Sequence, residues 1–412
     1  MTAFEPLTDF GKVPNGWVWG TATAAHQIEG GNVNNDWWRF EHTEGSGTTE
    51  SSGDACDSWH RWEEDLELVK RMGLDSYRMS IEWSRIEPAE GEFSLAALGQ
   101  YRRQLAAAQA MGLKTNVTLH HFTTPLWMAD KGGWDTPEVV DYFERYAGKV
   151  VEYLGEHIDI CATFNEPNVV AMMGWLIGQF PPGIQGDNDA HARVTHHFIA
   201  AHKLARVVLK AGPGSFPVGL TLGLADIVFH LDGDINGEGV RAADLPGDDR
   251  DSEAMRLMSG AYLEAARDDD YIGVQTYFTM HLDANGQPLP VPEEWRTTQM
   301  GWTFTPEALG VTVRLAYEVA GVPVIVTENG IATENDDERI EYYSRSLTAL
   351  RAAMDDGVDV RGFYAWSLLD NFEWAEGYRP VFGLTAVDLE TFERTPKPSS
   401  QWYAALVAAS RS

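Results

Sequence analysis

The feature that most constrains the fold is a repeated alternation of short apolar runs with longer segments of helical pattern along 412 residues. The apolar runs are nearly continuous rather than strictly alternating, which is typical of strands that are covered on both faces. Such strands belong to parallel sheets packed between helices. The eight predicted strands span residues 16–24, 74–80, 113–121, 158–165, 216–224, 271–277, 322–328 and 360–369.

The segments between these runs carry helix signals. Ser94 is an expected N-cap, because its hydroxyl can accept a hydrogen bond from the first turn. Two Thr-Pro pairs predict caps at Thr136 and Thr305, each with proline at the first helical position. Four of the predicted helices span residues 94–112, 135–155, 305–321 and 336–357.

Eight strands that alternate with helices predict an α/β protein, a single-domain (β/α)8 TIM barrel over residues 1–412. The alternative is an open doubly wound sheet, but no glycine-rich phosphate-binding loop follows the first predicted strand. Residues 230–270 are acidic and rich in glycine and aspartate. We interpret them as a long excursion between a strand and a helix, and not as a second domain.

The composition argues against several classes of partner. Lys and Arg number 31 and Asp and Glu number 62, a formal net charge of −31, which disfavours binding to nucleic acid and to anionic membranes. No apolar run approaches the roughly 18 residues of a membrane span, and residues 1–14 lack the pattern of a signal peptide. Cys56 and Cys161 form neither a metal-type pair nor a disulfide framework. We therefore expect a cytoplasmic protein without a cofactor, and the oligomeric state stays open.

Polar and aromatic side chains stand at or just beyond the ends of seven of the eight predicted strands. In a (β/α)8 barrel, the active site is built at the carboxyl ends of the strands. A single polar strand end is commonly the start of a loop, whereas seven on one rim indicate a functional site. These residues are Gln27, Glu29, Arg78, His120, His121, Asn165, Glu166, Tyr277, Glu328, Trp366, Glu373 and Trp374.

Two acids of this rim are flanked by asparagine: Glu166 in TFNEP and Glu328 in VTENG. Cleavage of a glycosidic bond requires a pair of carboxyl groups, one protonated and one ionised. Arg78 and Tyr277 would favour the ionised form of a neighbouring carboxylate. The alternative is that each glutamate is only one half of a buried ion pair with an arginine.

The remaining rim residues suit a sugar. Hydroxyl groups need fixed donors and acceptors, and the apolar face of a pyranose ring needs an aromatic platform. Candidates for these two tasks are Gln27, His121, Asn165 and Glu373 for the hydroxyls, and Trp366 and Trp374 for the platform.

Six segments together resemble glycoside hydrolase family 1, the retaining β-glycosidases. The resemblance implies that Glu166 is the acid/base and Glu328 the nucleophile. It also implies that Arg78 and Tyr277 orient the nucleophile and that Asn165 contacts the 2-hydroxyl. Gln27, His121, Glu373 and Trp374 would hold the non-reducing sugar, and Trp366 would lie under it. The matching segments are residues 19–30, 77–88, 118–127, 163–167, 326–330 and 366–378.

The activity that this resemblance implies is that of a retaining exo-β-glycosidase, first a β-glucosidase, acting on small β-glycosides or oligosaccharides. Both catalytic carboxyl groups should then lie about 5–5.5 Å apart. Glu373 favours neutral sugars over phosphorylated ones. The chain departs from the usual family pattern at several positions, which leaves the preferred leaving group open. These positions are His26, Phe122, Asn168, Gln275 and Thr276.

Several alternatives stay open at this point. β-Galactosidase or β-fucosidase activity, or transfer of the sugar to an alcohol, would use the same two acids. A non-catalytic sugar-binding protein would be expected to have lost one of them, and both are present. A metal-dependent hydrolase would need His120 and His121 to bind one ion, but adjacent residues of a strand point to opposite faces.

Overall fold

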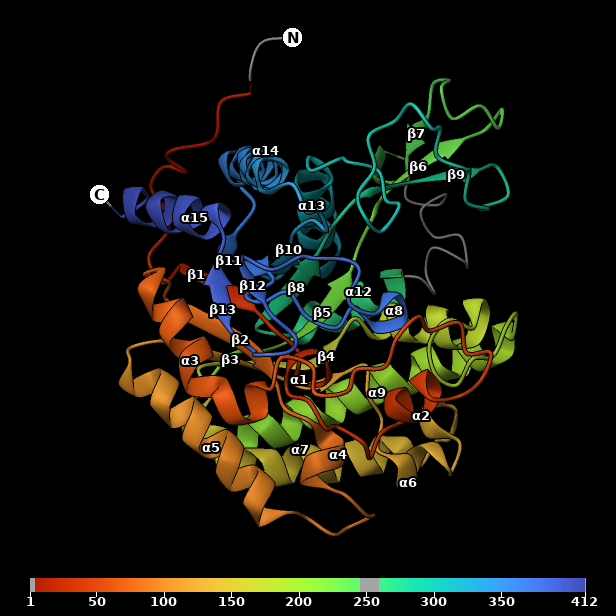
Figure 1. Cartoon of the computed structure of the whole chain (residues 1–412). Coiled ribbons are helices and arrows are strands. Elements are labelled where there is room, and N and C mark those ends of the chain that lie inside the picture. The colour runs from red at the N-terminus through yellow and green to blue at the C-terminus, as the bar shows by residue number, and fades with distance from the viewer. Residues whose placement is uncertain (1–3, 245–258, 412) are drawn as a thin grey trace.

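The structure is a computed structural model that describes residues 4–244 and 259–411. Eight parallel strands close into a barrel in the order β1-β11-β10-β8-β5-β4-β3-β2, with helices around it (Figure 1), which confirms the predicted (β/α)8 fold. Seven of the predicted apolar runs contain one of these strands, and the run at 322–328 overlaps β10, which ends one residue later. The bounds are β1 (Val18–Ala22), β2 (Ser76–Ser80), β3 (Lys114–His121), β4 (Ile160–Asn165), β5 (Val218–Gly223), β8 (Tyr271–Gln275), β10 (Val324–Asn329) and β11 (Val360–Trp366).

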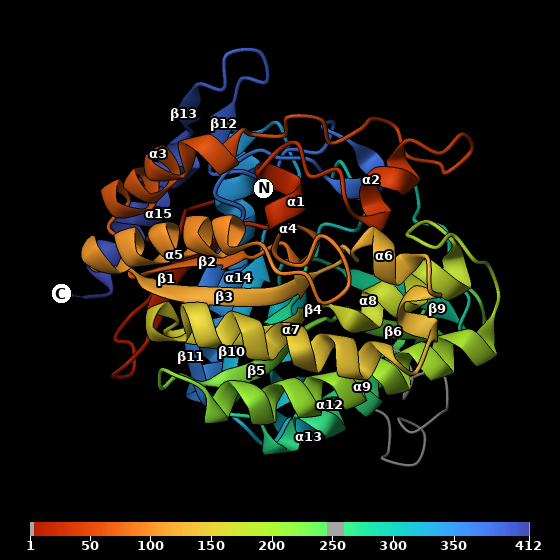
Figure 2. The same ribbon diagram turned by 90° about the horizontal axis from the view of Figure 1, so that it is seen from below.

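The helices cover the outer surface of the barrel. Figure 2 shows α5, α7 and α9 side by side along one flank, where their apolar faces pack on the strands. Their bounds, in chain order, are α1 (Ala25–Ile28), α2 (Asp36–Glu41), α3 (Ser58–Arg71), α4 (Trp83–Ile86), α5 (Leu95–Ala110), α6 (Leu126–Ala129), α7 (Val139–Leu154), α8 (Pro167–Met172), α9 (Asn188–Ala211), α12 (Ala261–Ala265), α13 (Ala308–Ala320), α14 (Asp336–Asp355) and α15 (Pro398–Ala409).

The predicted helix starts are right in one case and wrong in two. Ser94 caps α5 by accepting a hydrogen bond from the backbone N–H of Ala97. Helices α7 and α13 begin later than predicted, so neither Thr136 nor Thr305 is a cap. The Thr136 hydroxyl donates to the carboxylate of Glu138 instead, and the Thr305 hydroxyl accepts from the backbone N–H of Thr279.

Two small sheets stand beside the barrel. Strands β5 and β8 continue beyond its carboxyl edge as β6 (Asp226–His230) and β9 (Thr279–Asp283), which pair in parallel (Figure 1). Strand β7 (Val240–Arg241) pairs with β6, and β12 (Thr385–Val387) pairs with β13 (Arg394–Pro396).

The excursion predicted for residues 230–270 lies between β6 and the segment that leads into β8. Residues 245–258 of this stretch lie outside the described residues. Within the described ranges, no helix is long and apolar enough to cross a bilayer.

Candidate active site

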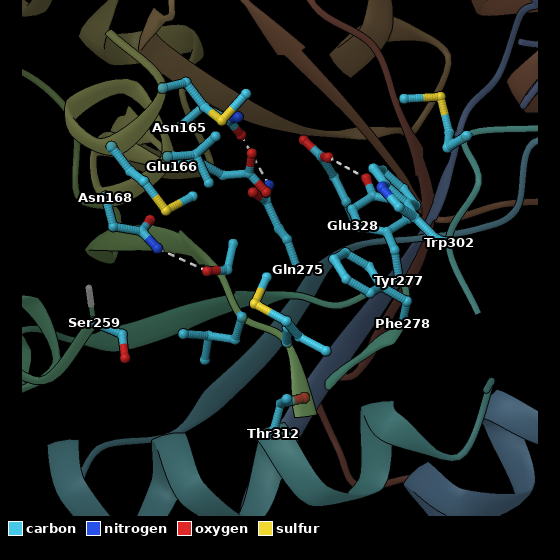
Figure 3. A pocket seen from close by; sticks show the side chains of 18 of the residues that line it. Asn165, Glu166, Asn168, Ser259, Gln275, Tyr277, Phe278, Trp302, Thr312 and Glu328 are labelled. Carbon is cyan, nitrogen blue, oxygen red and sulfur yellow. Dashed lines mark hydrogen bonds between the residues drawn. The ribbon is translucent and has the colours of Figure 1, made fainter. Parts of the chain in front are cut away.

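The two predicted catalytic acids stand at the carboxyl ends of β4 and β10. The pairing register shifts between Ala162 and Asn165 in β4, and between Val326 and Glu328 in β10. Glu166 follows β4 with a left-handed backbone, φ 44° and ψ 54°, and is the residue from which α8 begins. Figure 3 shows the side chains of Glu166 and Glu328 on the two sides of one space.

Glu328 is fully engaged by neighbours. The buried Arg78 guanidinium of β2 donates from Nη1 to Glu328 Oε1 at 2.5 Å, and the Tyr277 hydroxyl donates to Oε2 at 2.6 Å (Figure 3). Arg78 Nη2 also donates to Asn165 Oδ1 at 2.6 Å, and Gln275 Nε2 donates to the same oxygen at 2.8 Å. These bonds fix one carboxylate and one amide in a single network.

Glu166 has a different environment. Among the described residues, no hydrogen-bond or ion-pair partner contacts its carboxyl group, and the residue is 9% exposed. A glycine beside it leaves room for that group: a Cβ atom on Gly223 would lie 2.7 Å from Glu166 Oε1. Any larger residue at position 223 would force the acid to move.

These surroundings give the two acids different proton affinities. Burial, followed by the negative charge of Glu328, raises the pKa of Glu166 well above its usual range, and Arg78 opposes this only in part. Burial also raises the pKa of Glu328, but Arg78 and the Tyr277 hydroxyl stabilise the ionised form directly. The arrangement therefore favours the protonated form of Glu166, and at Glu328 the contacts with Arg78 and Tyr277 favour the ionised form.

A third acid lies in the same cavity. Burial and the charge of Glu328 raise the pKa of Glu373 to about 8, and the Gln27 amide opposes this by donating to Glu373 Oε2 at 3.4 Å. Gln27 Nε2 is held by the Phe372 carbonyl as well, at 2.8 Å. Gln27 Oε1 and His121 Nδ1 are buried with no protein partner among the described residues, so they are available to a ligand.

Aromatic rings form one wall of the cavity. The His121 ring is nearly parallel to the ring of Trp374 (16°, 5.9 Å between centroids) and to that of Trp366 (23°, 6.2 Å). His26 also stacks on Trp374, at 5.6 Å and 9°, and Phe122 packs against Trp374 at 4.8 Å. His26 and Phe122, two positions that depart from the usual family pattern, thus both pack against the ring of Trp374.

The cavity has a volume of about 570 Å³ and is lined by nine of the ten predicted site residues. Arg78 is the exception, because it does not line the cavity itself but contacts two residues that do, Glu328 and Asn165. The nine that line it are Gln27, His121, Asn165, Glu166, Tyr277, Glu328, Trp366, Glu373 and Trp374.

Two further rim candidates do not belong to the site. Glu29 ends the short helix α1 and pairs with Arg85 at 2.8 Å, away from the cavity. His120 points to the outer side of β3, where its ring packs against Trp134 and Phe164. His120 and His121 therefore do not meet, as the strand geometry predicts.

Several cavity residues were not predicted. Gln275 donates a hydrogen bond to Asn165, although we had noted Gln275 only as a departure from the family pattern. Met172 and Met173 come from the helix that follows Glu166, and the spacing of apolar residues after TFNEP could have indicated them. Met280 and Trp302 come from loops and edge strands that carry no such signal.

The chain matches a known protein family over most of its length. A model described as glycosyl hydrolase family 1 matches residues 10–228 and 263–412. The chain belongs to this family. It is therefore a hydrolase that acts on glycosidic bonds, and the resemblance seen in its six sequence segments is confirmed.

Proteins named as β-glucosidases or β-glycosidases match nearly the whole chain. Beta-glucosidase A of Acetivibrio thermocellus is 33% identical over 95% of this chain and 97% of its own length. A bifunctional beta-D-glucosidase/beta-D-fucosidase of Bifidobacterium breve is 33% identical over 96% and 98%. The structure of a beta-glycosidase from Pyrococcus horikoshii superposes with a TM-score of 0.85 at 35% identity, covering 99% of this chain and 96% of that chain.

Proposed function

We propose that the protein is a retaining exo-β-glycosidase, most active as a β-glucosidase, that removes non-reducing terminal β-D-glycosyl residues. The observation that carries the proposal is the asymmetry of the two acids in one cavity. Arg78 and Tyr277 bind Glu328 and favour its ionised form, whereas burial raises the pKa of Glu166, whose carboxyl group has no hydrogen-bond or ion-pair partner among the described residues. A nucleophile and a proton donor need these two states.

The first step breaks the glycosidic bond. The Glu328 carboxylate attacks the anomeric carbon and forms a covalent glycosyl ester, while Glu166 gives its proton to the departing oxygen, which leaves as an alcohol. The pKa of Glu166 depends in part on the charge of Glu328, which supports a close approach of the two groups. We expect their separation to be about 5–5.5 Å, as retaining enzymes require.

The second step releases the sugar. Glu166 is now ionised and takes a proton from water, whose oxygen attacks the anomeric carbon and displaces Glu328. The sum is a glycoside and water converted to a sugar and an alcohol, with both acids restored. Transfer to an alcohol in place of water would use the same step, so transglycosylation is a variant of this proposal.

The sugar would be held by the polar groups that the protein leaves unpartnered. Gln27 Oε1 and His121 Nδ1 can bond hydroxyls, Asn165 can bond the 2-hydroxyl, and Trp366 offers a ring face to the pyranose. β-Galactosidase or β-fucosidase activity is the second candidate. The Bifidobacterium breve relative is named as both a beta-D-glucosidase and a beta-D-fucosidase, which favours fucosides over galactosides as further substrates.

A panel of nitrophenyl glycosides tests this function. We expect hydrolysis of the β-glucoside and slower hydrolysis of the β-fucoside and β-galactoside, with the α-anomers at least 10³-fold slower because Glu328 would have to attack from the wrong face. Proton NMR of the first product should show the β-anomer. Cleavage of α but not β substrates, or a first product of inverted configuration, would refute the proposal.

The role of Tyr277 predicts a change in the pH profile. Tyr277→Phe removes a donor that lowers the pKa of Glu328, so the acidic limb of kcat/KM should move to higher pH, because Glu328 must be ionised to attack. We also expect kcat/KM to fall about 10- to 100-fold. Tyr146→Phe, which removes a buried hydroxyl bonded to the Leu119 carbonyl, is the matched control. An unchanged acidic limb would exclude this role.

We further propose that residues 1–412 act as one catalytic domain in the cytoplasm. The barrel takes strands from both ends of the chain, which supports one folding unit. Cys56 and Cys161 are buried, free thiols, which suits a reducing compartment. Fractionation of the source cells and a single calorimetric unfolding transition would test these two statements.

A further inference from the structure

The helix that begins at Glu166 defines where a leaving group must lie. Because Glu166 protonates the departing oxygen in the proposed function, the leaving group has to lie against the cavity face of α8. Val169 and Met172 of α8, and Met173 directly after it, line the cavity at the third, sixth and seventh positions after the acid. All three are only half-buried, so they keep apolar surface that a ligand would remove from water.

The opposite side of this slot is also apolar. Phe278 and Trp302 stack at 4.9 Å with an interplanar angle of 16° and lie across the cavity from Asn168 (Figure 3), and Met280 and Met300 also line this cavity. Methionine side chains are unbranched and adapt to ligands of irregular shape. The cavity thus combines a stacked aromatic pair with four adaptable methionines, Met172, Met173, Met280 and Met300.

Among the described residues, few polar side chains line this part of the cavity, and they include Asn168, Asp226, Ser259 and Thr312. Asn168 Nδ2 is occupied, because it donates to the Gly223 carbonyl at 2.7 Å (Figure 3), and the Thr312 hydroxyl bonds with that of Thr276. Asn168 Oδ1 is buried and, among the described residues, has no hydrogen-bond partner, so it offers one acceptor. The several hydroxyls of a second sugar would lose water there without finding matching partners, which is costly.

We infer that the leaving group of the natural substrate is an apolar alcohol, a long alkyl or an aryl group, rather than a second sugar. This inference rests on the proposed β-glycosidase function and adds the chemical class of the group that occupies the slot between α8 and the Phe278–Trp302 pair. Asn168 Oδ1 admits a single hydroxyl on that group.

A series of alkyl β-glucosides tests the inference directly. Methyl, butyl, hexyl and octyl β-glucosides release alcohols of similar acidity, so differences in kcat/KM report the fit of the chain. We expect about a twofold gain for each added CH2 group, and thus more than tenfold from butyl to octyl. Octyl β-glucoside should also exceed cellobiose, although glucose is the better leaving group. A flat series, or cellobiose preferred over octyl β-glucoside, would overturn the inference.

A pair of matched variants locates the effect. Met172→Gln keeps the size of the side chain but makes the slot polar, and should lower kcat/KM for octyl β-glucoside about fivefold while leaving methyl β-glucoside within about twofold. Met111→Gln, at the far end of the barrel after α5, should change neither. Equal effects of Met172→Gln on both substrates would contradict the assignment. Nitrophenyl β-glucoside is the reference: if it is not cleaved, the proposed function itself fails.

Discussion

Replacing Glu328 by glycine is expected to abolish hydrolysis, and added azide is expected to restore cleavage with the opposite product configuration. Without the carboxylate, no covalent ester can form at the anomeric carbon, and kcat should fall by about four orders of magnitude or more. Glu166 stays in place and can still protonate a leaving group. A small anion that enters the vacated space can therefore attack from the α face.

The product distinguishes this role from a structural one. With an activated dinitrophenyl β-glucoside and azide, Glu328→Gly should give α-glucosyl azide, identified by the coupling constant of the anomeric proton. The wild-type enzyme should give no such product. The buried Arg78 loses its partner in the variant, so circular dichroism should first establish that the barrel is folded. A folded variant that yields no α-azide would refute the assignment of the nucleophile.

Glu166→Ala is expected to slow substrates in proportion to how much they need a proton. Alkyl β-glucosides release a poor leaving group, so we expect a loss of about 10³-fold in kcat/KM. Dinitrophenyl β-glucoside leaves without a proton, so its first step should change little. Its turnover should then stall at the covalent ester on Glu328, because no base activates water.

In Glu166→Ala, azide is expected to give the anomer opposite to the one expected from Glu328→Gly. It needs no base, so it should release the stalled ester from the β face and yield β-glucosyl azide with a higher kcat. The two variants control each other, since the same reagent gives opposite anomers. If Glu166→Ala reduced alkyl and dinitrophenyl glucosides equally and azide had no effect, Glu166 would not be the acid/base.

The barrel was predictable because each buried parallel strand leaves a continuous apolar run, and each run contains or overlaps a strand. The two Thr-Pro pairs misled the prediction of helix starts for a local reason. Proline suits a turn as well as the first helical position, and α7 and α13 begin only after such a turn. The sequence predicted Glu29 on the rim because it closely follows the first strand. In the structure Glu29 stands at the end of α1, and its carboxylate pairs with Arg85.

The position of Glu166 and Glu328 in one cavity was easier to predict than the grouping of residues in the proposed leaving-group slot. Glu166 and Glu328 sit in strand ends, whose direction follows from the barrel, and their motifs are specific. The slot beside them takes residues from α8, β9 and two loops, and apolar residues such as Met280 and Met300 look like ordinary core. Their grouping depends on how loops fold back over the barrel, which local patterns do not encode.

The closure of the barrel by β1 and β11 determines when the site can form during synthesis. Val18 pairs with Gly362 and Ala22 with Trp366, so β1, the first barrel strand to be synthesised, can pair with β11 only after the last barrel strand has been made. Until then, β1 and β10 each present an unpaired edge, and Trp366 and Trp374 have not joined the two acids. We therefore expect a nascent chain that already contains Glu166 and Glu328 to be inactive, with open strand edges that molecular chaperones could protect.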